Sequence, residues 1–390
     1  MKNTNVVIFG GSITCWGVIQ GLKNNNLNIY VVSSGASSIG SSSGYVKKNY
    51  ILKTNESEYL NKVKRIIHDI DLKPIIVIAG DDHALEKLSK GYGELIAISR
   101  PTFPPWSILE DVTDKYKLAK ISENIGLNSI PTINIHNEYE LNEWLETEGT
   151  FYKNGFFLKC KDSITFKNKY GTKGIICKSK KEIIDAYKKY DGFLGQLLLQ
   201  KYITGEIDEL VAVLMVLDQD SNVIEYNIQK KVRAGGGRFG STSLSVTLRN
   251  SQLFNQARKL VKHLRCTGPV GIQFKFDEDD QEYKIMEINA RFSVGVSLAV
   301  GAGDNLPLRM IEHFNGIENT INHNKRIGFL LWNPLTDLRF FLSRKIFKDF
   351  INNLSILIKP KIIVPLDFSD LKPFRIQFYS IIRAIIKKIL

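Results

Sequence analysis

Short apolar runs alternate with amphipathic segments through the first hundred residues. The apolar runs are 5–9, 28–33 and 74–80, and the segment 14–23 between the first two has helical character. An apolar run without polar alternation indicates a strand covered on both faces, and strands that alternate with helices are typical of a parallel sheet. The pattern therefore predicts a parallel α/β domain at the start of the chain.

The turn after the first run contains Gly10, Gly11 and Ser12. In Rossmann-like domains, a glycine turn that opens a helix brings the backbone close to a ligand. The spacing here is Gly-Gly-Ser and not GxGxxG, so it favours a structural turn or a substrate loop over a dinucleotide site. A proline cluster at 101–105 marks a linker that ends this Rossmann-like domain near residue 105.

Residues 106–316 mix strands and helices in an α+β order. The expected helices span 111–126, 180–190 and 252–264, and the expected strands span 156–160, 175–177, 197–203, 210–217, 223–230, 270–276 and 283–288. Two polar, glycine-containing loops are expected at 167–174 and 233–240. The last four strands are expected to form two hairpins.

Polar side chains gather on the last hairpin. Gln273 lies on one strand, and Glu287 and Asn289 lie two residues apart on its partner, so these two share a face of the sheet. Oxygen ligands of this kind suit Mg²⁺, which commonly bridges protein groups and substrate phosphates. Arg291 projects to the same side and can bind phosphate with two hydrogen bonds. The alternative is an ordinary polar hairpin surface, but the grouping on one strand among apolar neighbours favours a metal and phosphate site.

Two lysines occupy positions that suit phosphate binding. Lys159 ends an apolar strand ahead of a glycine loop, and Lys115 begins a helix, where the backbone already favours anions. Either lysine alone is usually a solvated charge. Together with a metal site they indicate two clamps on a triphosphate.

From residue 5 to 315 the order of elements resembles the ATP-grasp superfamily, nearest to its carbamoyl-phosphate-synthetase-like branch. The most specific matching segment is Met286-Glu287-Ile288-Asn289-Ala290-Arg291. The resemblance implies three parts: a Rossmann-like domain over 1–105, an ATP-grasp domain over 106–316 with a smaller lid subdomain at about 130–203, and a basic extension over 317–390.

The resemblance also implies roles for single residues, with Mg-ATP held between the two ATP-grasp subdomains. The implied ATP-binding residues are Lys115, Lys159, Gly171, Gly174, the hinge Gln200, Lys201, Tyr202 and Ile203, whose backbone contacts adenine, and Glu206 and Asp208 near the ribose. The implied metal ligands are Gln273, Glu287 and Asn289, and the implied catalytic residues are Arg291, Lys173 and Arg233.

The sequence departs from the family pattern in three places. Gln273 stands where many relatives have Asp or Glu, and the carbamoyl-phosphate-synthetase-like branch also uses glutamine there. Ala290 replaces a common proline. The segment 170–174 is less glycine-rich than the usual phosphate loop, which leaves its individual phosphate contacts open.

The resemblance implies an ATP-dependent carboxylate–amine ligase. A carboxylate attacks the γ-phosphate of ATP, and an amine displaces phosphate from the acyl phosphate; positioning and charge neutralisation carry such chemistry. The implied cofactors are ATP and two Mg²⁺ ions, with Mn²⁺ as a substitute. An amino sugar, an amino acid or a cell-envelope precursor would be the acceptor, held by segments 231–240 and 292–303. The alternatives are a carboxylase acting through carboxyphosphate and a non-catalytic nucleotide-binding regulatory protein.

The positive charge is concentrated at the end of the chain. The formal net charge is +13, and from Lys325 onward 13 Lys/Arg and 4 Asp/Glu leave +9. No nucleic-acid motif accompanies this charge, so an anionic substrate or membrane surface is the better match. From Phe378 onward, apolar residues recur at three- and four-residue steps, which predicts an amphipathic helix with a basic face. Such a helix either docks on the core or lies on anionic lipid.

The remaining features indicate a cytoplasmic enzyme. The four cysteines form no CxxC pattern, the first apolar run is too short for a signal peptide, and no stretch reaches the roughly 20 apolar residues of a membrane span. The small-molecule carboxylate and amine are the expected partners, with peripheral contact at the inner membrane surface through the basic helix. By analogy with the resembled family, a homodimer is also expected.

Overall fold

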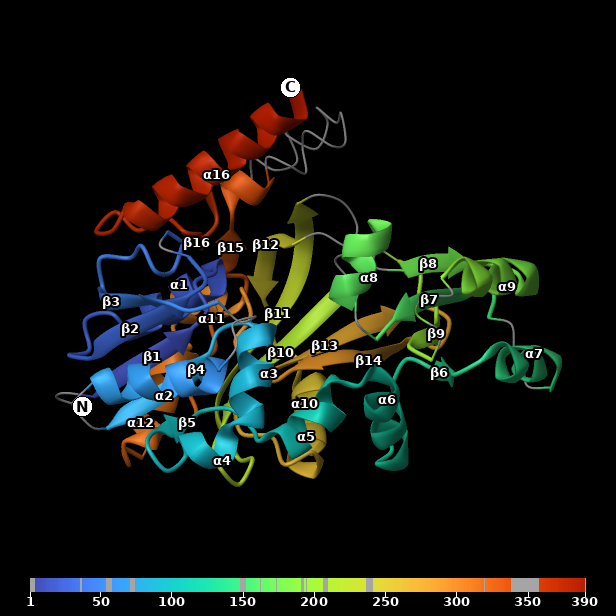
Figure 1. Ribbon diagram of the computed structural model, residues 1–390, viewed down its shortest axis with the longest axis horizontal. Coiled ribbons are helices and arrows are strands. Elements are labelled where there is room, and N and C mark those ends of the chain that lie inside the picture. The colour runs from blue at the N-terminus through green and yellow to red at the C-terminus, as the bar shows by residue number, and fades with distance from the viewer. Residues whose placement is uncertain are drawn as a thin grey trace. The chain divides into compact units, whose positions relative to one another are not determined.

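The computed structural model describes two compact units. The larger comprises Met1–Glu110, Ile207–Ile272 and Ile288–Leu390, and the smaller comprises Asp111–Glu206 and Gln273–Glu287. Figure 1 labels the elements of both. The description leaves out residues 1–3, 36, 54–57, 71–73, 148–151, 162, 173, 191–192, 194, 206–209, 236–240, 319, 338–357 and 390, together with the side chains of 163–165, 167, 241 and 384–389.

The larger unit begins with a five-stranded parallel sheet in the order β3-β2-β1-β4-β5. Its strands are β1 (Asn5–Phe9), β2 (Asn28–Ser33), β3 (Val46–Ile51), β4 (Ile75–Ala79) and β5 (Arg100–Pro101). Every residue of β1 and β4 is buried, which confirms the parallel α/β start of the chain. The sequence pattern missed β3, because this edge strand is polar and largely exposed.

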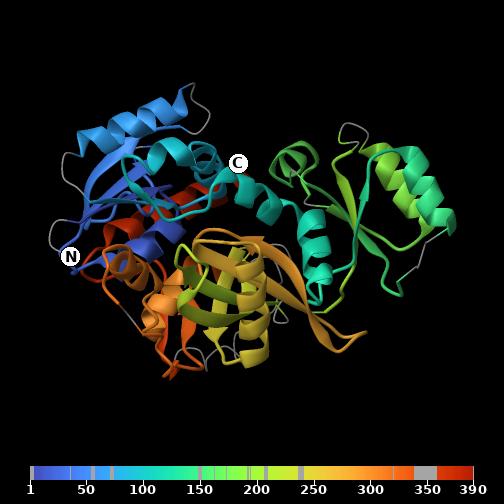
Figure 2. The ribbon, with the colours of Figure 1, turned by 90° about the horizontal axis from the view of Figure 1, so that it is seen from below.

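Helices cover both faces of this sheet. They are α1 (Ile13–Leu22), α2 (Tyr59–Asp69), α3 (Asp82–Lys90) and α4 (Tyr92–Leu95). Ser12 caps α1 by accepting a hydrogen bond from the backbone N–H of Thr14 at 3.2 Å. In Figure 2, the light-blue α2 lies on one side of the sheet and the orange α12 (Leu306–Phe314) lies on the other.

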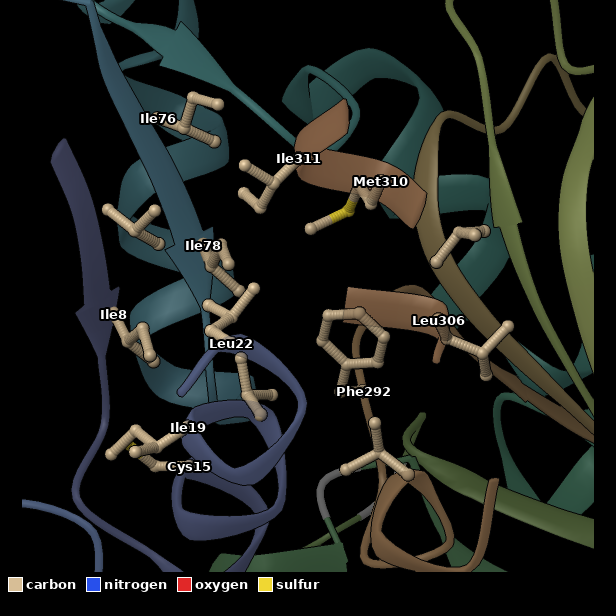
Figure 3. Packing of buried hydrophobic residues seen from close by; sticks show 14 of the residues in the cluster. Ile8, Cys15, Ile19, Leu22, Ile76, Ile78, Phe292, Leu306, Met310 and Ile311 are labelled. Atoms are coloured by element: carbon tan, nitrogen blue, oxygen red, sulfur yellow. The ribbon is translucent and has the colours of Figure 1, made fainter. Parts of the chain in front are cut away.

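One hydrophobic core joins this sheet to a later part of the chain. Ile8 and Ile78 from the sheet and Ile19 from α1 pack in one cluster with Phe292 and Met310 (Figure 3). A Cβ on Gly17 of α1 would lie 2.3 Å from Ser297 Oγ of α11 (Val296–Ala302), so only glycine permits this approach of the two helices. The segment that follows Arg291 is therefore fixed by the core of the larger unit.

A seven-stranded sheet has the order β14-β13-β10-β11-β12-β15-β16. Its strands are β10 (Leu210–Leu217), β11 (Val223–Gly235), β12 (Ser241–Thr247), β13 (Gly268–Asp277), β14 (Glu282–Asn289), β15 (Leu330–Trp332) and β16 (Lys361–Ile363). The helix α10 (Ser251–His263) precedes β13. The hairpins expected at 210–230 and 270–288 are confirmed as β10–β11 and β13–β14. The basic extension supplies β15, β16 and the final helix α16 (Lys372–Ile389).

The smaller unit has a four-stranded antiparallel sheet in the order β6-β9-β7-β8. The strands are β6 (Thr132–Ile135), β7 (Phe156–Cys160), β8 (Gly174–Cys177) and β9 (Leu197–Lys201), and the helices are α6 (Lys115–Asn124), α7 (Glu138–Thr147), α8 (Ser163–Tyr170) and α9 (Lys180–Lys189). Leu141 of α7 and Ile183 of α9 share one core with Phe156 and Leu199 of the sheet. Figure 2 shows α7 and α9 adjacent to one another beside the strands.

Three local expectations are corrected by the structure. The single helix expected at 111–126 is two helices, α5 (Trp106–Thr113) and α6, because Asp114 caps a new helix by accepting from the N–H groups of Tyr116 and Lys117. The first half of the loop expected at 167–174 belongs to α8, and the Tyr170 ring lies 4.7 Å from that of Tyr190. The expected loop start at Lys231 to Gly235 is the end of β11, paired with β12.

Among the described residues, no helix combines the length and the apolar character needed to cross a bilayer.

Candidate functional site

The β13–β14 hairpin brings two of the predicted metal ligands into contact. Gln273 Nε2 donates a hydrogen bond to Glu287 Oε1 at 2.7 Å, and both side chains are half-buried. Asn289 lies two residues further along β14 and is also half-buried, so strand alternation puts it on the face of Glu287. One carboxylate and two amides therefore line one stretch of the hairpin.

Lys159 is a buried lysine at the end of β7. Its Nζ donates to Gln200 Oε1 at 2.6 Å, and Gln200 Nε2 in turn donates to Thr132 Oγ1 at 2.9 Å. Burial and the nearby charge of Lys115 lower the pKa of Lys159 to about 7, although the Glu287 carboxylate acts in the opposite direction. Residues from three distant segments of the sequence thus interact electrostatically within the smaller unit.

Lys115 is the first residue of α6. The carboxylate of Asp114 accepts from two backbone N–H groups of this helix, at 2.8 and 3.0 Å, and Lys161 Nζ lies 3.6 Å from its Oδ2. The helix start therefore combines the positive end of a helix dipole with Lys115 and Lys161. The Asp114 carboxylate already binds two of these N–H groups and pairs with Lys161, a lysine that was not predicted from the sequence.

The hinge strand β9 ends on a buried ion pair. Lys201 Nζ lies 2.7 Å from Asp277 Oδ2 and 3.4 Å from Asp279 Oδ2. Burial acts to lower the pKa of Lys201, but the hydrogen bond and charge of Asp277 outweigh it, so the pKa is raised. The Lys201 side chain therefore connects β9 to the β13–β14 turn through ion pairs with Asp277 and Asp279. The sequence interpretation had treated the Asp-rich segment 277–280 only as a turn.

The two residues after Lys201 continue the predicted hinge. The Tyr202 N–H donates to the Gly155 carbonyl at 3.0 Å, and the Tyr202 ring lies 6.5 Å from that of Phe157. Ile203 is buried at 8% exposure. An aromatic and apolar lining of this kind is chemically suited to a planar heterocycle.

Arg291 is bound to a carboxylate of the larger unit. Its Nε and Nη2 each lie 2.6 Å from one oxygen of Asp82, the first residue of α3. The Arg291 side chain is 18% exposed and that of Asp82 is 59% exposed. Asp82 thus orients the guanidinium, and a two-point contact of this geometry is also the one that a phosphate group accepts. The sequence contained Asp81 and Asp82 without suggesting this partner.

Arg233 is buried near the end of β11 and not placed in a loop. Its guanidinium binds Asp337 through Nε, at 3.0 Å, and through Nη2. Ser243 Oγ and Trp332 Nε1 also donate to Asp337, at 2.8 and 3.0 Å. The charge of Arg233 is therefore compensated by the C-terminal extension, a contact that sequence spacing gave no means of finding.

The glycines predicted to close over phosphate have different surroundings. Gly171 has a φ of +74° with open space around it, whereas a Cβ on Gly174 would lie 2.5 Å from the Leu158 carbonyl oxygen. Packing of β8 against β7 thus requires glycine at position 174. Lys173, Glu206, Asp208 and Arg238 lie outside the described residues.

The oxygen atoms of Gln273, Glu287 and Asn289 suit a hard cation that takes only a few of its ligands from the protein. In the described parts of the chain, no three or more His, Cys, Asp or Glu side chains are grouped to hold a metal. The Glu287 carboxylate with the Gln273 and Asn289 amides offers only oxygen ligands and one formal negative charge. Such a set fits Mg²⁺, which usually takes one or two carboxylates and completes its shell with water and substrate phosphates.

Comparison with known families and curated proteins gives matches over part of the chain. The family described as "ATP-grasp in the biosynthetic pathway with Ter operon" matches residues 197–331. Over 158 residues the chain is 31% identical to the mitochondrial carbamoyl-phosphate synthase [ammonia] of Mus musculus and 30% identical to that of Homo sapiens. Each match covers 36% of this chain and 10% of the relative. The chain thus spans about a tenth of the length of these curated relatives.

Solved structures match over most of the chain. The biotin carboxylase domain of Hydrogenobacter thermophilus 2-oxoglutarate carboxylase, solved with MgADP and bicarbonate, gives a TM-score of 0.64 at 18% identity, covering 84% of this chain and 73% of that one. The L-amino acid ligase from Bacillus licheniformis gives 0.59 at 17% identity, covering 79% and 74%. At these identities the likeness shows the fold, which agrees with the fold class predicted from the sequence.

Proposed function

We propose that the chain is an ATP-grasp enzyme, an ATP-dependent ligase that joins a carboxylate to an amine; the family match over residues 197–331 and the shared fold support this. The observation that carries the proposal is the electrostatic cluster of Lys115, Lys159 and Glu287 in one unit. Two cations beside a carboxylate–amide pair suit a triphosphate with its metal. Ligases are among the proteins that share the fold.

In the proposal, each predicted residue has one task. Lys115 and Lys159 bind phosphate oxygens, and the hinge backbone from Gln200 to Ile203 binds the adenine edge. Glu287, Gln273 and Asn289 would hold magnesium, which supplies positive charge to the phosphates when bound. Arg291 stabilises the charge of the transferring phosphoryl group, which passes to the substrate carboxylate as an acyl phosphate.

The remaining predicted residues complete the nucleotide and acceptor sides of the proposal. Gly171, Gly174 and Lys173 belong to the segment proposed to close over phosphate, and Glu206 and Asp208 to the ribose contact. Arg233, predicted as a catalytic residue, lies in the segment proposed to hold the acceptor; its salt bridge with Asp337 supports a positioning role, because the guanidinium is already neutralised. An amine of the amino acid or amino sugar class is the proposed nucleophile. A homodimer is part of the proposal by analogy with the dimeric biotin carboxylase domain.

The test is ADP release with Mg-ATP against pooled amino acids, amino sugars and bicarbonate. Glu287→Gln keeps the size of the side chain and removes its charge, so substrate-dependent ADP release should fall by about 100-fold or more. Arg291→Ala should have a similar effect. Glu282→Gln is the matched control, because it lies on β14 and is exposed; its activity should stay near that of the parent chain.

Three results contradict the proposal in different ways. Release that depends on bicarbonate alone indicates a carboxylase acting through carboxyphosphate. Nucleotide binding without release under any condition indicates a regulatory protein. Full activity of both Glu287→Gln and Arg291→Ala rejects the assignment of these residues to the reaction.

A further inference from the structure

The final helix, α16, has two contrasting sides along its described length. Gln377 and Ile381, one turn apart, are 7% and 5% exposed, so this row docks on the larger unit. Leu371, just before the helix, is 38% exposed, and Phe378 and Tyr379 are 43% and 62% exposed. At 100° per residue Phe378 and Tyr379 lie away from the docked row, and Leu371 is exposed where the chain enters the helix. Two aromatic residues therefore lie on the exposed side of α16, here called its outward side; Figure 1 draws this helix in red.

Basic residues share this outward side. Lys372, Arg375 and Arg383 are exposed, and at helical spacing they lie between and beside Phe378 and Tyr379. The eighteen residues of α16 contain no Asp or Glu. The outward side thus alternates rings and cations with no carboxylate on the helix.

The two carboxylates that precede the helix are bound to the fold. Asp370 accepts from Ser43 Oγ at 2.6 Å and from the Gly44 N–H at 2.9 Å, and Asp367 lies 2.7 Å from Lys23 Nζ. These contacts fix the start of α16 on the parallel-sheet part of the larger unit. Because both carboxylates are bound to the fold, neither Asp367 nor Asp370 neutralises the cations on the outward side of α16.

We infer that the outward side of α16 binds the surface of an anionic lipid bilayer, with the helix lying in the plane of the interface. Aromatic and leucine side chains enter the headgroup boundary, while arginine and lysine contact lipid phosphates. With a rise of 1.5 Å per residue, a helix of this length presents about 27 Å of contact line. The contact is peripheral, and it is independent of the proposed ligase reaction.

A second copy of the chain and an acidic protein are the competing occupants. A two-fold contact between copies would bring the same surface against itself, so Arg375 and Arg383 would face like charges. An acidic protein surface would neutralise the cations, but it offers no apolar layer to the exposed rings of Phe378 and Tyr379. A bilayer surface with anionic headgroups supplies both partners at once.

The test is co-sedimentation of the full chain with vesicles of phosphatidylglycerol mixed with phosphatidylcholine, against vesicles of phosphatidylcholine alone. Binding is expected to the anionic vesicles and to weaken with added salt, because screening reduces surface attraction. The double variant Arg375→Glu/Arg383→Glu should bind about tenfold less or weaker still. Phe378→Ser/Tyr379→Ser should also reduce binding, which separates apolar insertion from charge alone.

The matched control changes the same number of charges elsewhere. Lys181→Glu/Lys189→Glu alters two exposed lysines of α9 and should leave vesicle binding unchanged. Tyr379→Trp gives an independent signal, because the emission of a tryptophan that enters the interface shifts to the blue when anionic vesicles are added.

Four outcomes overturn the inference: equal binding to both kinds of vesicle, no binding to either, an unshifted Tyr379→Trp emission, or an α9 control that binds as weakly as the α16 variants. Sedimentation velocity without lipid measures whether the chain forms a dimer through this surface instead. A dimer that Arg375→Glu/Arg383→Glu dissociates would assign the surface to a second copy.

Discussion

At the scale of single residues, Lys159 connects the structure most directly to nucleotide binding. The buried ammonium is bound by the neutral side chain of Gln200 and feels the positive charge of Lys115. Burial disfavours the charged form most, and the charge of Lys115 adds to this effect; together they outweigh the Glu287 carboxylate and lower the pKa of Lys159 to about 7. A triphosphate placed beside it would favour the protonated form.

This pKa predicts that Mg-ATP binding takes up a proton in mildly alkaline solution. The free lysine is protonated below about pH 7 and mostly deprotonated one unit above it, and bound phosphate raises its pKa again. Affinity should therefore fall as pH rises above about 7. Titration calorimetry in buffers of different ionisation enthalpy should give close to one proton per nucleotide one unit above that pKa, and almost none one unit below it.

Lys159→Met should abolish this proton uptake and weaken binding at the lower pH. Lys153→Met, a lysine of the same unit in the turn before β7, is the control and should keep the uptake. Uptake that persists in Lys159→Met would assign the proton to another group.

At the scale of elements, the end of β11 depends on the C-terminal extension. Asp337 is 1% exposed and receives hydrogen bonds from Arg233, Ser243 and Trp332. These donors come from β11, β12 and β15, which are neighbouring strands of one sheet. One buried carboxylate thus holds three strand ends together.

Asp337→Ala should destabilise the larger unit strongly. The substitution leaves the guanidinium of Arg233 buried without its partner, and breaking a buried pair in this way costs about 3–5 kcal/mol. Urea unfolding followed by circular dichroism measures the change. Asp69→Ala is the control, because its pair with Lys48 is exposed; its unfolding midpoint should hardly move. A midpoint for Asp337→Ala equal to that of the control would contradict the structural role.

At the scale of the whole molecule, the chain builds two units from interleaved segments. The residues proposed for phosphate binding, Lys115 and Lys159, belong to the smaller unit, and Arg291 belongs to the larger one. The chain passes from the smaller unit to the larger one within β14, between Glu287 and Ile288, so Glu287 belongs to the smaller unit and Asn289 to the larger. Ligand binding to the proposed residues should register in the thermal stability of the chain.

Mg-ATP should therefore raise the thermal unfolding midpoint of the full chain. At a nucleotide concentration one hundred times the dissociation constant, the stabilisation is about 2.7 kcal/mol. Removal of the metal with EDTA should abolish most of it, because the proposed ligands Glu287, Gln273 and Asn289 contact nucleotide through the ion. Equal stabilisation by ATP with and without EDTA would exclude this metal role, and Glu282→Gln should behave like the parent chain.

The hydrophobic pattern of the sequence was sufficient to predict the strands that are buried on both faces and those that form hairpins. The runs that became β1 and β4 have no exposed residue, so their pattern is unambiguous. The helix start at Lys115 was predicted, but the pattern failed where polar residues dominate: the edge strand β3 was missed, and one helix was expected over 111–126 where the structure has two. Local hydrogen bonds decide such boundaries, and a hydrophobic pattern does not record them.

The sequence by itself determined the order of most elements, and the resemblance of segment 286–291 predicted an ATP-grasp fold. Strand alternation predicted that Glu287 and Asn289 share one face of β14. Only the tertiary structure decided which groups these side chains meet. Asp82 lies 209 residues from its partner Arg291, and Asp337 lies 104 residues from Arg233. Charge compensation and burial act through space between such positions, so residue spacing along the chain carries no signal for them.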